Sequence, residues 1–291
     1  MLTRCIAPLS LIAIALAAPA ALAAESAAAS LVLVRQGSLP IILTAPHGGR
    51  ERIPGASQRE MITDKVDASR RWGGFHRGGD LNTDILVQII AAEIKALLGR
   101  DAYLVMAKFE RKFIDVNRPP DLAFDGAEAK PYYDLYHSSI RRFVDEVRRE
   151  YPAALLIDVH GQNKDPEALM RGTLNGRAVE RLLQRSGPES IVGPNGLFGQ
   201  LEVNGFKVFP ANDIPIGRRS EDAGFNGGYT IRTYGSHTAD GVDAIQMEFG
   251  RKYRQKITLD QTGKDAAKSI VAFYKAYLRV GTNDLPRSEN R

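Results

Sequence analysis

Fully apolar segments of strand length alternate with helical segments along most of this chain, and this alternation restricts the fold more than any other sequence feature. A strand that is apolar on both faces has to be covered on both faces, and helices are the usual cover. The pattern therefore predicts an α/β sandwich. The expected strands are Leu31–Val34, Leu39–Leu43, Ala102–Ala107, Ala153–Val159 and Ala244–Phe249, and the expected helices are Leu81–Leu98, Tyr132–Arg149, Ala178–Leu183 and Asp265–Leu278.

Neither an internal repeat nor a Pro/Ser-rich linker divides the sequence after residue 30. We therefore expect a single α/β domain over residues 24–291. Within it, residues 50–80 form a long polar and glycine-rich segment. Loops of this length inside a compact domain usually carry function.

The N-terminal segment has the features of an export signal. Arg4 precedes an apolar stretch from Ile6 to Leu22, and Ala21-Leu22-Ala23 supplies the small residues that a signal peptidase requires. An uncleaved membrane anchor is the alternative, but two prolines interrupt the stretch and no basic cluster follows it. We expect residues 1–23 to be a cleaved signal peptide and the mature protein to be periplasmic or secreted, with no stable membrane association.

Cysteine usage restricts the possible chemistry. The single cysteine, Cys5, lies inside the expected signal peptide, so the mature chain has no thiol. A disulfide scaffold, a cysteine nucleophile and a Cys-ligated zinc site are thereby excluded. Any metal must be held by His, Asp or Glu.

The charge balance argues against a nucleic-acid partner. The chain has 39 Lys and Arg against 34 Asp and Glu, a formal charge of +5, and no basic run is longer than two residues. Nucleic-acid-binding proteins concentrate basic residues in patches or stripes. A basic pocket for an anionic small molecule remains compatible with this balance.

Polar residues gather at the ends of three expected strands. His47 follows the second strand, Asp158 and His160 end the fourth, and Glu248 lies near the end of the fifth. In open α/β sheets, ligands bind outside the carboxyl ends of the strands. Two histidines with carboxylates at such an edge are typical of a catalytic zinc site, in which Asp158 could orient His160 through its second nitrogen. The alternative is a pair of hydrogen-bonded histidines with no metal.

The third zinc ligand has three candidates. Asp84 ranks first, because it lies one turn inside the expected helix, where a capping role is a poor explanation for a carboxylate. Asp80 ranks second, since an aspartate directly before a helix is explained by N-capping. Glu51 ranks third, four residues after His47 in the same loop.

Charged and apolar residues are interleaved from Arg111 to Arg118, which predicts a partly buried segment whose charges need partners. A structural pairing of Arg111 or Arg118 with Asp115 is one interpretation. Arginines beside a zinc site could instead polarise a substrate carbonyl and bind a substrate carboxylate through two hydrogen bonds. Arg232, after a glycine pair, is either another anion contact or part of a turn.

Taken together, these residues resemble the N-formylglutamate amidohydrolase family, which is related to the zinc carboxypeptidases. The matching stretches follow the family's order from about residue 40 to 255 and so cover most of the mature chain. They are Pro46-His47-Gly48-Gly49 with Ile53-Pro54, Thr83-Asp84, Arg111–Pro119, Tyr136-His137, Asp158-Val159-His160-Gly161, Gly227-Gly228-Tyr229-x-x-Arg232 and Gln246-Met247-Glu248.

The resemblance implies a phosphorylase/hydrolase-like α/β fold, similar to that of the zinc carboxypeptidases: a three-layer sandwich with a mixed central sheet. It also implies one zinc ion bound by His47, Asp84 and His160, with Glu248 activating the attacking water. The structural alternative for Glu248 is an ion pair with Arg251.

Further roles follow from the same resemblance. Asn117 and Arg118 look like the pair that binds the substrate carboxylate, Arg111 like the arginine that polarises the carbonyl, and Arg232 like a further substrate contact. His137 also matches a family position, but no role follows for it, and a packed, hydrogen-bonded histidine is the simpler interpretation.

The expected function is zinc-dependent hydrolysis of the amide bond of an N-formyl or N-acyl amino acid similar to N-formylglutamate. The expected partner is a small acidic N-acyl amino acid or a short peptide. One alternative is an exported zinc carboxypeptidase or poly-γ-glutamate-type peptidase with the same site. Another is a non-catalytic periplasmic binding protein for acidic ligands, which would need the arginines but no metal.

Overall fold

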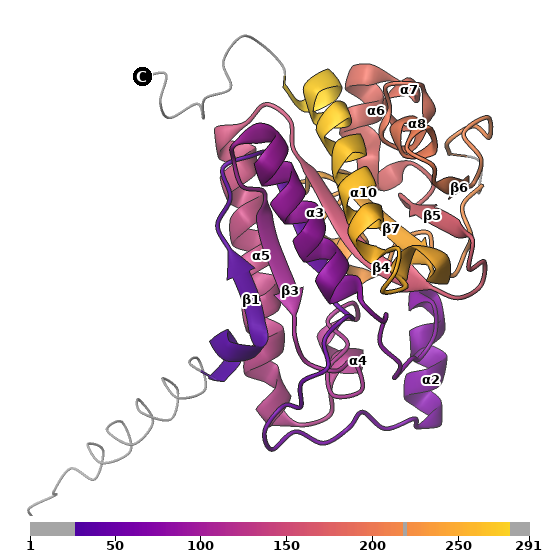
Figure 1. The fold of residues 1–291 in the computed structure, drawn as a ribbon. Coiled ribbons are helices and arrows are strands. Elements are labelled where there is room, and N and C mark those ends of the chain that lie inside the picture. Colours follow the sequence, from indigo (N-terminus) through magenta and orange to yellow (C-terminus); the bar gives the residue numbers. More distant parts are fainter. Residues whose placement is uncertain (1–26, 218–219, 280–291) are drawn as a thin grey trace, which may run out of the picture.

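A mixed β-sheet forms the centre of this computed structural model, which describes residues 27–217 and 220–279 (Figure 1). Seven strands of the described residues lie in the order β1-β3-β2-β4-β7-β5-β6. The four central strands β3, β2, β4 and β7 are parallel, whereas β1, β5 and β6 run in the opposite direction. Their bounds are β1 Val32–Arg35, β2 Ile41–Ala45, β3 Tyr103–Ala107, β4 Leu155–Gln162, β5 Ala168–Gly172, β6 Lys207–Phe209 and β7 Asp243–Gly250.

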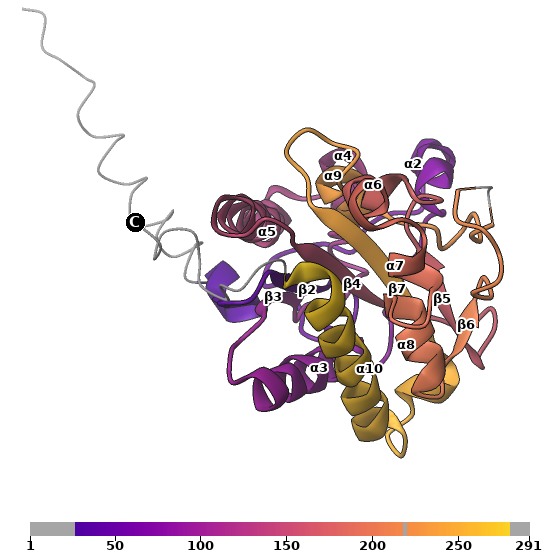
Figure 2. The same ribbon diagram turned by 90° about the horizontal axis from the view of Figure 1, so that it is seen from above.

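Helices cover both faces of the sheet (Figure 2). On one face, α3 (Thr83–Leu98), α8 (Leu197–Val203) and α10 (Leu259–Phe273) share a buried apolar cluster with alternate residues of the strands. On the other face, α5 (Lys130–Glu150) and α9 (Tyr229–Tyr234) pack against the remaining strand residues. The predicted α/β three-layer sandwich with a mixed sheet is confirmed.

Shorter elements connect these layers. The helices are α2 Thr63–Ser69, α4 Pro120–Ala123, α6 Glu180–Ser186 and α7 Glu189–Val192. The 3₁₀ turns are η1 Arg70–Trp72, η2 Ala127–Ala129, η3 Arg177–Val179 and η4 Arg251–Arg254, and the π-helical segment η5 Tyr274–Leu278 continues α10. No helix in residues 27–217 and 220–279 combines the length and apolar composition that crossing a membrane requires. The predicted signal peptide lies outside the described residues.

Helix α3 shows how the local sequence sets the geometry next to the site. Leu86, Ile90 and Ile94 recur at helical spacing and are buried. The helix ends at Gly99, whose φ of 70° is the left-handed conformation that glycine adopts without strain. It begins at Thr83, two residues later than the sequence pattern predicts, because residue 82 also has a positive φ.

Candidate metal centre and active site

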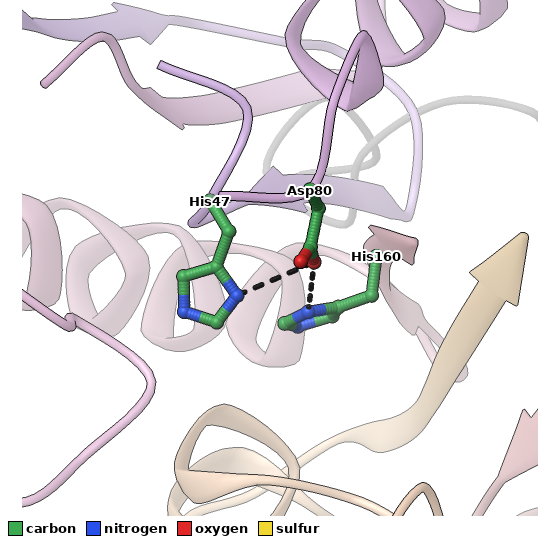
Figure 3. A group of neighbouring side chains, drawn as sticks. All are labelled: His47, Asp80 and His160. Atoms are coloured by element: carbon green, nitrogen blue, oxygen red, sulfur yellow. Dashed lines mark hydrogen bonds and ion pairs between the residues drawn. The ribbon is translucent and has the colours of Figure 1, made fainter. Parts of the chain in front are cut away.

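Two histidines and one aspartate from three separate segments meet at the carboxyl ends of the parallel strands (Figure 3). The Oδ2 atom of Asp80 lies 3.4 Å from Nδ1 of His47 and 3.1 Å from Nδ1 of His160. The three potential ligand atoms lie within 4.8 Å of one another, and all three residues are buried. Two imidazole nitrogens and one carboxylate oxygen form a donor set that suits a catalytic zinc ion.

The fold brings these segments together through adjacent strands and one backbone contact. His47 follows β2, and His160 lies on β4, the parallel neighbour of β2. The chain after His47 returns to the same place at Asp80. There the N–H of Asp80 donates a 2.9 Å hydrogen bond to the carbonyl of His47 and fixes the return. Gly79 permits this approach, since a Cβ atom there would lie 2.7 Å from that carbonyl oxygen. Thr83 Oγ1 donates to the carbonyl of Asp80 and fixes the turn before α3.

The second nitrogen of each imidazole ring contacts a fully buried carboxylate. His47 Nε2 lies 2.7 Å from Asp115 Oδ1, and His160 Nε2 lies 2.9 Å from Asp158 Oδ2. Because an ionised carboxylate only accepts, Nε2 donates in both pairs, and Nδ1 is left to face Asp80. This arrangement is typical of metal-binding histidines, whose outer nitrogen is held by a carboxylate. The predicted contact between Asp158 and His160 is present; the role of Asp115 beside His47 was not predicted.

The electrostatics of this group also suit a cation. Burial alone would lower the pKa of His160, yet attraction to Asp158, Asp80 and Glu248 raises it well above its ordinary value. Burial opposes ionisation of Asp80, but the two histidines hold its pKa well below the usual range. Several carboxylates are therefore concentrated around two imidazoles inside the protein, and this surplus of negative charge is the environment that a divalent ion requires.

The structure favours Asp80 over Asp84 as the third ligand. Within the described residues, the group of potential ligand atoms includes Asp80 and does not include Asp84. N-capping, the reason for ranking Asp80 second, does not apply, because its Oδ2 atom accepts from the backbone N–H of Gly161 and faces the histidines. Asp84 lies in the first turn of α3 with a buried, unpartnered Oδ1 atom. Glu51 is exposed and forms a β-bridge with Phe109.

We call His47, Asp80 and His160 the metal group. Glu248 lies beside it on β7, directly opposite His160 on the neighbouring strand β4. Its Oε1 atom is 4.0 Å from His160 Nδ1 and accepts a 2.8 Å hydrogen bond from Gln246 Nε2. Its Oε2 atom is buried and has no partner. Burial raises the pKa of Glu248 to about 8, close to the pH at which a general base or acid is most effective. The alternative ion pair with Arg251 is not among the ion pairs of the described residues.

Asp115 joins the metal group to a cluster of arginines. Its Oδ2 atom accepts a 2.8 Å hydrogen bond from Arg111 Nε and lies 3.7 Å from Arg59 Nη2 and 3.9 Å from Arg118 Nη1. Burial would raise the pKa of Asp115, but Arg111, Arg118 and His47 hold it well below the ordinary value. The predicted Arg–Asp pairing is present, and both Arg111 and Arg118 also line the cavity beside the histidines. Arg59, in the long loop, was not predicted.

Asn117 and Arg118 are held mainly by contacts within the protein. Arg118 donates to the carbonyl oxygens of Asn117 and Gly74 at 2.8 and 2.6 Å. The Nδ2 atom of Asn117 lies 3.3 Å from His160 Nε2, and its Oδ1 atom accepts from the N–H of Thr230. The structure thus places the Asn117 amide between a metal-group histidine and the start of α9, on the wall of the same cavity.

The two remaining family positions have different surroundings. Arg232, on α9, lines the cavity, and its guanidinium carbon lies 5.6 Å from the centre of the Trp72 ring. His137, on α5, hydrogen-bonds through its two ring nitrogens to Tyr234 Oη and the carbonyl of Val116. Burial lowers the pKa of His137 to about 4. The packed, hydrogen-bonded interpretation of His137 therefore fits its surroundings.

One cavity of about 1100 Å³ joins these groups. It has room for a small acyl amino acid or a short peptide, since ligand pockets range from roughly 300 to 1,000 Å³. The site residues that line it are His47, Asp80, His160, Glu248, Arg111, Asn117, Arg118 and Arg232.

Comparison with known proteins identifies relatives of this architecture. No family model matches the sequence. The N-formylglutamate deformylase of Pseudomonas putida is 24% identical over 256 residues, which cover 74% of this chain and 82% of that protein. The crystal structure of N-formylglutamate amidohydrolase from Ralstonia eutropha superposes with a TM-score of 0.58 at 16% identity, covering 86% of this chain and 98% of that one.

The resemblance to N-formylglutamate amidohydrolases is confirmed. A second crystal structure, of a gene product from Agrobacterium tumefaciens, has a TM-score of 0.54 at 14% identity and covers 84% of this chain and 95% of that one. The two superpositions show that the three-layer fold is shared. The match to the N-formylglutamate deformylase adds sequence similarity over about three quarters of this chain.

Proposed function

We propose that this protein is a zinc-dependent amidohydrolase that cleaves the amide bond of an N-acyl amino acid, with N-formylglutamate as the candidate substrate. The observation that carries the proposal is the position of Glu248. Its buried, unpartnered Oε2 atom lies in the same cavity as the convergent donors of His47, Asp80 and His160. The similarity to the N-formylglutamate deformylase supplies the candidate substrate.

The chain's own residues account for the proton transfers of such a hydrolysis. His47, Asp80 and His160 would hold the zinc ion, which would supply Lewis acidity for the acyl carbonyl and for the attacking water when bound. The Oε2 atom of Glu248 accepts the proton that the water loses as its oxygen attacks the carbonyl carbon. Glu248 then delivers that proton to the leaving nitrogen as the amide bond breaks, which regenerates the carboxylate.

The arginines bind and orient the substrate. Asp115 holds the Arg111 guanidinium through Nε, so its remaining N–H groups are available to the acyl oxygen. Arg118 borders the same cavity and supplies the charge for the carboxylate of the amino-acid portion. Asn117 accepts a hydrogen bond from the N–H of Thr230 through Oδ1 and so holds the start of α9 in position behind this pair.

Metal content and turnover test the proposal together. The purified protein should contain about one zinc ion per chain and release formate from N-formyl-L-glutamate. Asp80→Asn should lose most of the metal and the activity, whereas the matched variant Asp84→Asn should retain both. A metal-free protein with full activity, or an Asp80→Asn variant with normal zinc, would contradict the proposal.

A peptide-cleaving function is the second candidate, because a cavity of about 1100 Å³ exceeds the needs of a formyl amino acid. The same site would then release a C-terminal residue from a peptide or a γ-linked oligomer. Comparing kcat/KM for N-formyl-L-glutamate and for γ-L-glutamyl-L-glutamate distinguishes the two. Binding of both without turnover would instead support a non-catalytic binding protein.

We also propose that residues 1–23 direct export and are removed, which would make the mature protein periplasmic or secreted. The basic start, the apolar stretch and the Ala21-Leu22-Ala23 sequence support this proposal. Mass spectrometry of protein from cell fractions of the native host should find a chain that starts at Ala24. An intact Met1 in the membrane fraction would contradict cleavage.

A further inference from the structure

Arg254 is a buried cation beside the active-site cavity, and its hydrogen bonds within the described residues all end on uncharged oxygens. It closes the turn η4, which follows β7 directly, and is 5% exposed. Its guanidinium donates to three backbone carbonyls, from Nε to Phe249 at 2.8 Å, from Nη1 to Leu81 at 2.7 Å and from Nη2 to Gln162 at 3.1 Å. Nη2 also lies 3.3 Å from the amide oxygen of Asn163. A buried charge is costly unless hydrogen bonds satisfy it, and here neutral oxygens of three segments do so.

The three carbonyls share one feature, because each lies one or two residues after a group of the candidate site. They are those of Leu81 after Asp80, Gln162 after His160 and Phe249 after Glu248. The three segments are far apart in sequence and meet only in the folded protein, at the carboxyl ends of the parallel strands. One side chain therefore joins the backbone behind two residues of the metal group and behind the proposed general base.

Gly161 lets the guanidinium approach the metal group closely. A Cβ atom on Gly161 would lie 2.4 Å from Cζ of Arg254, so the space for the guanidinium depends on the missing side chain. The N–H of the same glycine donates a 3.1 Å hydrogen bond to Asp80 Oδ2, the atom that faces both histidines. Burial lowers the pKa of Arg254, whereas the negative charges of Asp80 and Glu248 act to raise it. The cation thus lies near both carboxylates but directs its hydrogen bonds at the backbone.

The contact with the segment after Asp80 runs in both directions and needs the shape of an arginine. Asn82 Nδ2 donates a 2.7 Å hydrogen bond to the carbonyl of Arg254, while Arg254 donates to the carbonyl of Leu81. A guanidinium holds its N–H groups in fixed directions in one plane, whereas a lysine ammonium is a point charge on a flexible stem. Only the guanidinium can hold three carbonyls at a set spacing.

We propose that Arg254 is a positioning residue, which fixes the spacing of the three segments and thereby the convergence of the metal ligands with the general base. This inference rests on the proposed function, because it takes the metal group as the zinc ligands and Glu248 as the base. Arg254 acts through the backbone in this role, so its loss should weaken metal binding and turnover. Substrate binding should change little, because Arg111 and Arg118 are held by other contacts.

Arg254→Lys tests whether charge alone is sufficient. The variant keeps the aliphatic stem and the positive charge, so it should fold, but its ammonium cannot hold the three carbonyls together. Its zinc affinity, measured by chelator competition, should fall by about 10- to 100-fold, the usual cost of losing support behind metal ligands. With cobalt in place of zinc, its visible absorption spectrum should shift, since that spectrum depends on the geometry of the ligands. At saturating zinc, kcat for N-formyl-L-glutamate should fall about tenfold or more, while KM changes by less than about threefold.

Arg254→Ala allows a rescue experiment. Because Arg254 lines the cavity, the space that its side chain leaves should be open to small cations. Methylguanidinium at millimolar concentration should restore zinc affinity and kcat to this variant, whereas methylammonium should not, because it lacks the planar set of donors. Lys252→Gln is the matched control. It removes a positive charge from the same turn, at an exposed residue that pairs with Glu167, and should leave zinc affinity, the cobalt spectrum and kcat unchanged.

Metal binding and turnover separate failure of the positioning role from failure of the proposed function. Normal zinc affinity with an unshifted cobalt spectrum in Arg254→Lys would overturn the positioning role, as would equal rescue of Arg254→Ala by both cations. Hydrolysis of N-formyl-L-glutamate by the unmodified protein would then leave the function standing. Zinc binding that depends on the Arg254 guanidinium, in a protein that hydrolyses no N-formyl-L-glutamate, would support the positioning role and remove the proposed function.

Discussion

At the residue scale, the unpartnered Oε2 atom of Glu248 defines the sharpest experiment. Glu248→Gln preserves the shape of the side chain and removes its basicity, so the variant should bind zinc normally and keep its melting temperature. Its kcat should fall by about 10²- to 10⁴-fold, the usual cost of losing a general base. Steady-state kinetics with a metal assay on the same sample measure both quantities. Retention of more than about a tenth of kcat would make Glu248 a structural residue.

Replacing Asp115 tests whether this residue supports the metal ligand His47, holds the buried arginines, or does both. Asp115→Asn removes the buried charge that holds both His47 Nε2 and Arg111 Nε. Zinc affinity should fall by about 10- to 100-fold, because the outer nitrogen of a metal-binding histidine loses its carboxylate. The free energy of unfolding should fall by about 3–5 kcal/mol, since buried arginines lose their counter-charge.

Chelator competition and urea unfolding measure the two effects of Asp115→Asn. Asp121→Asn, at an exposed position in the following helix α4, is the control and should resemble the unmodified protein. A variant at Asp115 that loses stability and keeps full zinc affinity would limit Asp115 to holding the arginines.

At the scale of elements, the strands that are apolar on both faces could be predicted, and the irregular ones could not. The central strands β2, β3, β4 and β7 all overlap predicted segments; β3 falls within its segment, β7 extends its segment at both ends, and β2 and β4 begin and end later than predicted. Strand β5 was missed because it contains Arg171, a buried charge whose partner Glu221 is far away in sequence. Strand β6 has three residues, two of them exposed, and so lacks a detectable pattern.

The residues of the candidate site can be divided in the same way, into those that lie on or next to regular strands and those that belong to an irregular segment. The sequence predicted that His47, His160 and Glu248 lie close together, because they lie at or near the carboxyl ends of neighbouring parallel strands, which meet at one edge of the sheet. The proximity of Asp80 to the two histidines was not predicted, because it depends on where the segment of residues 50–80, which contains α2 and η1, returns to the sheet, and no local periodicity encodes that return. The contact of Arg59, in the same segment, with Asp115 was not predicted for the same reason.

The contact between helices α5 and α9 through His137 has a pH-dependent consequence. The pKa of His137 is about 4 in the folded protein, against an ordinary value of 6.5. Below pH 6.5 the unfolded chain therefore binds a proton that the folded protein does not, and stability falls as the pH drops toward 4. Between pH 7.5 and pH 5 this residue should account for a loss of about 1–2 kcal/mol.

Urea unfolding at the two pH values, with and without His137→Gln, measures this contribution. The variant should be less stable at pH 7.5, because it loses packed contacts, but its stability should depend less on pH. An equal pH dependence in both proteins would show that other groups are responsible.

At the scale of the whole molecule, zinc should stabilise the fold by mass action. A ligand that binds only the folded state at a thousand times its Kd adds about 4 kcal/mol to the free energy of unfolding. In a protein of this length that increase should raise the Tm by about 8–16 °C. Differential scanning calorimetry with zinc and with a chelator measures the shift, and Asp80→Asn should show almost none of it. The same shift in that variant would place the metal elsewhere.

The segment of residues 50–80, predicted as a loop but containing α2 and η1, ends at Asp80, and this has a consequence for proteolysis. Arg70, in η1, and Arg77, in the irregular part that follows, are exposed trypsin sites of this segment, and the N–H of Asp80 hydrogen-bonds the end of the segment to the carbonyl of His47. A metal that ties Asp80 to both histidines would close the loop at its C-terminal end and restrict the local opening that a protease needs. Trypsin should therefore cut the loop more slowly in zinc than in a chelator, and Asp80→Asn should remove the difference. Resistance to trypsin would then report metal occupancy of this protein in a crude extract, before any substrate is known.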